Sequence, residues 1–166
     1  KRAWHAGESS WKGLNDMNSR SIGIEIVNPG EKKLKSYPKI QIDQLINLIH
    51  FLEEKFKIPF CNILGHSDIA PHRKIDPGKH FPWKELYKKK IGLWVEINQI
   101  INRSLSEKES NEFLQNLYKI GYQSPKINNF KTNSAMIIDA FHRHFVPNLV
   151  GKKPTSISLI KSRELI

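Results

Sequence analysis

The sequence is short of cysteine, of acidic residues and of long apolar runs. Its 166 residues include one cysteine, and 16 Asp and Glu residues stand against 27 Lys and Arg residues. A lone Cys61 excludes an internal disulfide, and its apolar neighbours predict a small core residue. No apolar stretch is long enough to cross a bilayer, and no signal-like segment opens the chain. We therefore expect no transmembrane segment in this chain.

The excess of basic residues indicates which kinds of binding partner the chain favours. A net charge of +11 favours polyanions, among them nucleic acid, an anionic membrane face and bacterial cell wall. The basic residues are scattered apart from short clusters such as 88–90, and no RNA- or DNA-binding motif accompanies them. The sequence therefore predicts a solvated basic surface and no nucleic-acid partner.

Residues 65–78, with the sequence GHSDIAPHRKIDPG, place His, Lys and Asp directly after an apolar run. An imidazole and a carboxylate are common zinc ligands, and His66 and Asp76 fit that role. Lys74 lies two residues before Asp76, so in an extended segment the two side chains project the same way and the cation could hold an oxyanion. The alternative is that 76–78 is only a turn and that His66 merely ends a strand.

The motif at 65–78, read with RAWHAG at 2–7 and SIGIEI at 21–26, resembles the zinc-dependent N-acetylmuramoyl-L-alanine amidases of the AmpD and AmiD type. The resemblance implies zinc ligation by His66 and Asp76, with Glu25 and Lys74 as the catalytic pair. It implies hydrolysis of the amide bond between N-acetylmuramic acid and L-alanine, in peptidoglycan or in an anhydro-muropeptide. It also implies a bacterial cell-envelope location rather than the cytoplasm.

In that family a further zinc-binding His lies upstream of the RAWHAG-like block, and nothing precedes residue 1 here. We therefore expect an N-terminal fragment of the same precursor to supply the third zinc ligand, because a catalytic zinc takes three protein ligands. His5 is the alternative third ligand, although its position matches a family histidine that lines the substrate cleft. The residues that we expect to contact sugar and peptide are Trp4, His5, Asn15 and Arg73.

Residues 21–28 alternate in a way that predicts a strand, with Ile22 and Ile24 on one face and Glu25 on the other. A carboxylate in an apolar strand is costly unless it is solvated or partnered, and a metal-lined cleft would explain it. The alternative is an outward Glu on an edge strand. A helix at 41–56 and a short buried strand at 60–65 follow, an order typical of an α/β fold with a mixed β-sheet flanked by helices.

We expect three parts along the chain: an amidase domain at 1–90, a connecting segment at 91–105 and a small three-helix domain at 106–166. Ser106 with Glu109 forms a capping-box pattern, and Asn133 can cap the second helix. The layout of the helices is similar to the peptidoglycan-binding modules behind some amidases. His142 and His144 do not make a metal pair there, because residues two apart on a helix point in different directions.

Two other functions remain open on the sequence. A peptidoglycan-binding or recognition protein without catalysis would keep the cleft and lose the metal. A basic nucleic-acid-binding domain would leave Glu25, His66, Lys74 and Asp76 unexplained.

Overall fold

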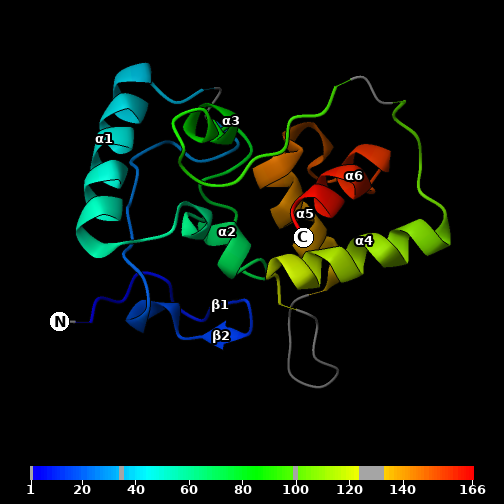
Figure 1. Cartoon of the computed structure of the whole chain (residues 1–166), viewed down its shortest axis with the longest axis horizontal. Coiled ribbons are helices and arrows are strands. Elements are labelled where there is room, and N and C mark those ends of the chain that lie inside the picture. The colour runs from blue at the N-terminus through cyan, green and yellow to red at the C-terminus, as the bar shows by residue number, and fades with distance from the viewer. Residues whose placement is uncertain (1, 34–35, 99–100, 124–132) are drawn as a thin grey trace.

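The computed structural model describes residues 2–33, 36–98, 101–123 and 133–166 (Figure 1). Helix α1 stands at one end of the molecule and helices α4, α5 and α6 form a bundle at the other, with the short helices α2 and α3 between them. The N-terminal hairpin lies beneath α2, at the side of the bundle. None of the described helices is long and apolar enough to cross a membrane.

Helix α1 (Lys39–Phe56) forms where the sequence predicts a helix with one buried face. Ile42, Leu45 and Ile49 recur at spacings of three and four and are buried, so this stripe faces inward. The stripe joins a small apolar cluster with residues from 81–91, where α3 (Trp83–Tyr87) lies. The helix ends at Phe56, and the Lys57 that follows it has a left-handed backbone. His50 lies off the stripe and is exposed, as expected.

The bundle consists of α4 (Glu107–Ile120), α5 (Ser134–Phe145) and α6 (Ser156–Glu164). The backbone N–H of Glu109 donates to the Ser106 hydroxyl at 3.3 Å, and the Glu109 carboxylate accepts from the Ser106 N–H at 2.9 Å. The backbone N–H of Met136 donates to the Asn133 side chain at 3.1 Å. Both predicted N-caps are therefore confirmed, since each side chain satisfies a helix N–H that has no partner within the helix.

The core of the bundle extends into the N-terminal segment. Trp11 packs edge-on against Tyr122 at 5.1 Å between ring centroids, and the backbone N–H of Lys12 donates to the Gly121 carbonyl at 2.9 Å. Gly121 has a φ of 140°, and a Cβ there would lie 2.8 Å from the Trp11 ring, so this close approach requires glycine. The division at 90 and 106 stays a prediction, while the apolar core itself is continuous between Trp11 and the bundle.

The β-structure of the described residues is one antiparallel hairpin, β1 (Ser10–Trp11) and β2 (Leu14–Asn15), in which Ser10 pairs with Asn15, and one isolated antiparallel bridge between Ser104 and Thr155. The short 3-10 helix η1 (Met17–Ser19) follows the hairpin directly. The chain is thus rich in helix with a small sheet, within the expected α/β class.

Two predicted strands do not form in the described structure. Residues 21–28 pair with no other strand there, and Ile22, Ile24 and Val27 are exposed. Residues 60–65 begin instead with the 3-10 helix η2 (Phe60–Asn62), and η3 (Pro147–Leu149) is a similar turn after α5. An apolar run becomes a strand only beside a partner, because its backbone groups need hydrogen bonds. Without one the N–H of Asn62 bonds locally, to the Pro59 carbonyl at 2.8 Å.

Candidate metal centre and catalytic loop

The loop at 65–78 brings its predicted ligands together. Helix α2 (His66–Ile69) starts directly after Gly65, and the backbone N–H of Ser67 donates to the Asp76 carbonyl at 2.9 Å. This tie places Nδ1 of His66 2.9 Å from Oδ2 of Asp76. The hydrogen bond to His66 is the largest cause that holds the pKa of Asp76 below its ordinary value. The two residues thus form a preassembled nitrogen and oxygen pair.

His66 and Asp76 are of the residue types that bind zinc, but a catalytic zinc site needs a third protein ligand as well. Imidazole nitrogen and carboxylate oxygen are both first-choice zinc ligands, and a catalytic zinc takes three protein ligands. Across residues 2–33, 36–98, 101–123 and 133–166, no group of three or more His, Cys, Asp or Glu side chains is placed to hold a metal. His5 is oriented elsewhere: its ring nitrogens lie 3.1 Å from the Ala3 carbonyl and 2.9 Å from the Ser21 hydroxyl.

The two predicted catalytic residues, Lys74 and Glu25, have different surroundings in the structure. Lys74 is half-buried and close enough that its charge contributes to the lowered pKa of Asp76. Glu25 is exposed and makes no hydrogen bond or ion pair within the described part of the chain. Lys74 therefore lies close enough to Asp76 for their charges to interact, and the catalytic roles of both Lys74 and Glu25 stay predictions.

The segment at 5–8 packs against the ligand pair through polar contacts. Oδ1 of the buried Asn18 accepts hydrogen bonds from the backbone N–H groups of His5, Ala6 and Gly7 at 3.0, 2.8 and 3.2 Å. The carbonyl of Ala6 then lies 3.2 Å from Nε2 of His66. Asn18 was not predicted from the sequence, because nothing in its own neighbourhood indicates that three backbone groups converge on it.

The predicted substrate contacts have different surroundings. Arg73 donates to the backbone carbonyls of Ala6 and Glu8, the latter at 2.9 Å from Nε, so its guanidinium already has protein partners. Trp4 is 78% exposed, with the Arg2 guanidinium 5.7 Å from the centre of its ring. Asn15 is exposed on β2. Direct contact of these residues with a substrate stays a prediction.

A buried carboxylate follows His66 by two residues on the same short helix. Asp68, on α2, is 1% exposed and accepts hydrogen bonds from the Gly65 N–H at 2.8 Å, the Tyr122 hydroxyl at 2.7 Å and Nδ1 of His144 at 2.8 Å. Burial, together with this carboxylate, raises the pKa of Tyr122 well above its ordinary value. Asp68 lies within the motif at 65–78, so the sequence could have marked it as a candidate. Its partners Tyr122 and His144 are distant in the sequence, and no local pattern connects them to it.

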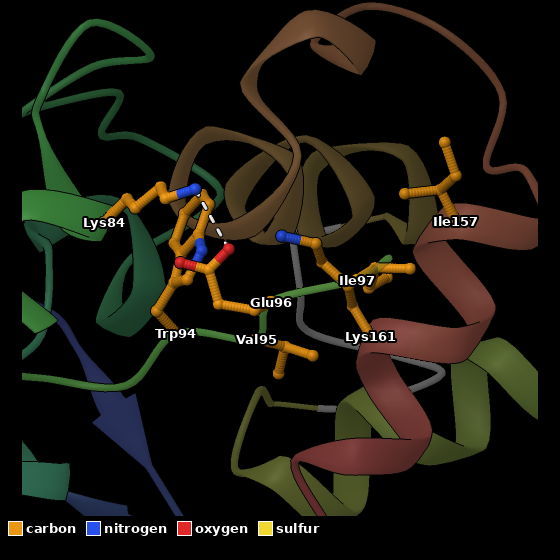
Figure 2. Close-up of a pocket in the computed structure, with 7 residues that line it drawn as sticks. All are labelled: Lys84, Trp94, Val95, Glu96, Ile97, Ile157 and Lys161. Atoms are coloured by element: carbon orange, nitrogen blue, oxygen red, sulfur yellow. Dashed lines mark hydrogen bonds and ion pairs between the residues drawn. The ribbon is translucent and has the colours of Figure 1, made fainter. Parts of the chain in front are cut away.

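A separate pocket of about 250 Å³ opens between the segment at 94–97 and helix α6 (Figure 2). Among its lining residues, Nζ of Lys84 lies 2.9 Å from the Glu96 carboxylate, and Nζ of Lys161 lies 3.9 Å from the centre of the Trp94 ring. Burial lowers the pKa of Lys161 to about 8. The remaining lining residues are Val95, Ile97 and Ile157. None of the predicted site residues lines this pocket.

Comparison with known proteins agrees with the motif. The family model for N-acetylmuramoyl-L-alanine amidase matches residues 1–79, which include the whole loop at 65–78. The solved structure of the amidase AmiD from E. coli in complex with the substrate anhydro-N-acetylmuramic acid-L-Ala-D-gamma-Glu-L-Lys superimposes with a TM-score of 0.87 at 30% identity, over 99% of this chain and 68% of that chain. This chain belongs to the N-acetylmuramoyl-L-alanine amidase family.

Curated relatives within the amidase family extend the comparison. AmiD of Escherichia coli is 35% identical over 159 residues, which are 89% of this chain and 57% of AmiD. The 1,6-anhydro-N-acetylmuramyl-L-alanine amidase AmpD of Haemophilus influenzae is 40% identical over 83 residues, which are 50% of this chain and 44% of AmpD. The chain therefore spans about half the length of these relatives. The match to AmiD includes the bundle, since its structure covers nearly all of this chain.

Proposed function

We propose that this chain carries the hydrolytic site of a zinc-dependent N-acetylmuramoyl-L-alanine amidase, which cleaves the amide bond between N-acetylmuramic acid and L-alanine in peptidoglycan or muropeptides. The observation that carries the proposal is the His66–Asp76 pair at 2.9 Å, held by the Ser67 to Asp76 backbone bond inside the amidase motif. The E. coli relative that was solved with an anhydro-muropeptide substrate supports a substrate of that class. The family's chemistry also supports a cell-envelope location.

In this mechanism His66 and Asp76 would hold the zinc, which supplies an acidified water and polarises the scissile carbonyl when bound. Glu25 takes a proton from the attacking water while the water oxygen bonds to the carbonyl carbon. Lys74 donates a hydrogen bond to the carbonyl oxygen as it gains negative charge. Glu25 then delivers its proton to the departing L-alanine nitrogen as the carbon–nitrogen bond breaks. Trp4, His5, Asn15 and Arg73 position the sugar and the peptide.

We assign the third zinc ligand to a histidine on an N-terminal fragment of the same precursor. Two observations support the assignment: the described residues supply two grouped ligands rather than three, and the backbone at 21–28 has no strand partner among them. Ile22, Ile24 and Val27 are exposed on that segment and would be covered by an added strand. Mass spectrometry of the purified native protein should find this fragment bound.

The decisive experiment replaces Glu25 with Gln in the intact protein and measures release of L-Ala-initiated peptides from purified anhydro-muropeptide. A lost general acid-base group lowers turnover by roughly 10²–10⁴-fold, because both proton transfers depend on it. Glu54→Gln is the matched control, since Glu54 is an exposed carboxylate on α1, and it should retain parental turnover. Turnover of the Glu25 variant within a few-fold of the parent would refute the role of Glu25.

The alternative of a peptidoglycan-binding protein without catalysis gains support from the two-ligand count. It predicts an intact protein that sediments with insoluble wall, contains no stoichiometric zinc and releases no peptide. Zinc at one equivalent together with peptide release would exclude it.

A further inference from the structure

The buried carboxylate of Asp68 connects the catalytic loop to two distant parts of the bundle. Its hydrogen-bond donors other than Gly65 are Tyr122, which lies just after α4, and His144, which lies on α5. His144 is 2% exposed, and its second ring nitrogen lies 3.3 Å from the Leu93 carbonyl. A buried charge is tolerated when hydrogen bonds replace its lost water, and three donors do so here.

The hydrogen bonds of Asp68 affect the His66–Asp76 pair because Asp68 lies on the same turn as His66. Helix α2 has only four residues, and so short a helix does not hold its orientation by itself. His66 starts this turn and Asp68 follows two residues later, so a fixed Asp68 fixes the turn that presents His66. The same turn carries the Ser67 N–H, which bonds to the Asp76 carbonyl at 2.9 Å.

Packing around Asp68 leaves little room for the turn to move. The Trp83 ring stacks on His144 at 3.8 Å between centroids, with 15° between the planes. A Cβ at Gly65 would lie 3.0 Å from Pro77 and 3.2 Å from the Asp68 carboxylate. Gly65 therefore lies between Pro77, at the other end of the loop, and the buried carboxylate, and His144 binds that carboxylate from the bundle side.

We propose that His144 and Tyr122 are positioning residues: by holding Asp68 they fix the turn that presents His66 to Asp76. The inference rests on the proposed function for its catalytic meaning, since it assigns to the bundle a part in ordering the metal site. The Tyr122 hydroxyl and Nδ1 of His144 bond to Asp68 rather than to His66 or Asp76, so both residues act through Asp68. The C-terminal helices would thus be needed for a closed catalytic loop, independently of any binding to cell wall.

The test is native-state hydrogen exchange of the Ser67 amide in this chain, compared with the Leu117 amide in the last turn of α4. His144→Phe keeps the ring that stacks on Trp83 and removes the donor to Asp68. We expect Ser67 to exchange at least about tenfold faster relative to Leu117, because the loop opens locally more often. His144→Asn, whose amide can donate from near the former Nδ1 position, should restore most of the protection. If His144→Phe does not fold, Tyr122→Phe removes one donor with a smaller perturbation and should shift the same ratio in the same direction.

Ser162→Ala is the matched control, because it removes two other buried hydrogen bonds of the bundle, from Asn116 at 3.0 Å and to the Leu159 carbonyl at 2.7 Å, without touching Asp68. It should leave the ratio of Ser67 to Leu117 exchange unchanged. A ratio that stays parental in the His144 and Tyr122 variants would overturn the proposal. The measurement needs neither zinc nor substrate, so its failure would leave the amidase assignment intact. Failure of the Glu25 assay, in turn, would leave the loop coupling intact.

Discussion

The loop at 65–78 with its N-terminal neighbours is stabilised by other kinds of interaction than the helical bundle. The loop region has two-residue strands and a four-residue helix, and its shape depends on side chains such as Asn18 and Arg73 that bind backbone groups. The bundle has capped helices around fully buried side chains such as Phe113 and Phe141. Irregular backbone can carry a site when a rigid neighbour fixes it, and Asp68 is the point at which the bundle does so here.

The two regions also differ in what they leave exposed. Phe141 lies at 5.3 Å from Phe113 and 4.9 Å from Phe145 between ring centroids, in a core without exposed members. The segment at 21–28 exposes Ile22 and Ile24 to solvent. A large effect of core truncation is therefore expected in the bundle, whereas truncation of the exposed apolar residues at 21–28 should cost little.

The largest expected effect comes from Phe141→Ala, which removes a fully buried ring from the bundle core. We expect the free energy of unfolding to fall by about 3–5 kcal/mol, because lost burial and a residual cavity add. Phe60→Ala is the matched control, since that ring is 52% exposed, and it should change stability by less than about 0.5 kcal/mol. Urea unfolding measures both, and similar losses for the two variants would remove the distinction between the buried ring of the bundle and an exposed ring outside it.

The next effect is a loss of bundle stability in acid. Burial lowers the pKa of His142 from its ordinary 6.5 to about 4. Between these values the unfolded state binds more protons than the folded state, so stability falls as pH falls from 6.5 to 4. The full shift corresponds to about 3 kcal/mol.

The acid effect is measured by urea unfolding of parent and His142→Gln across that pH window. The variant cannot titrate at this position and should lose less stability on acidification than the parent does. The exposed His50→Gln is the control and should follow the parent. Parallel curves for the parent and the His142 variant would contradict the assignment.

A smaller effect is expected in the loop region from Asn18→Ala. The change deprives three backbone N–H groups of their acceptor, so we expect a loss of about 1–3 kcal/mol. Exchange of the Ala6 amide should accelerate more than exchange in α4. Asn15→Ala, at an exposed position on the adjacent strand, should change neither measurement. Equal acceleration in both regions would mean that Asn18 supports the whole molecule rather than this segment.

Local patterns predicted the parts of the structure that depend on nearby residues. The caps at Ser106 and Asn133 and the buried stripe of α1 follow from spacings of three and four residues, and all three are observed. The strand at 21–28 does not form among the described residues, because β-pairing needs a neighbour that spacing alone cannot provide. The alternation of apolar and other residues at 21–28 is still typical of a strand, and for this reason we propose a partner strand for it.

By itself the sequence determined the amidase family, the motif at 65–78 and the proximity of His66 to Asp76, because these two residues are joined by a local turn and one backbone bond. Only the tertiary structure decided what holds that turn. Tyr122 and His144 lie 54 and 76 residues beyond Asp68 in the chain. A buried carboxylate needs hydrogen-bond donors in place of water. Which residues supply them depends on the packing of the whole interior and not on the local sequence.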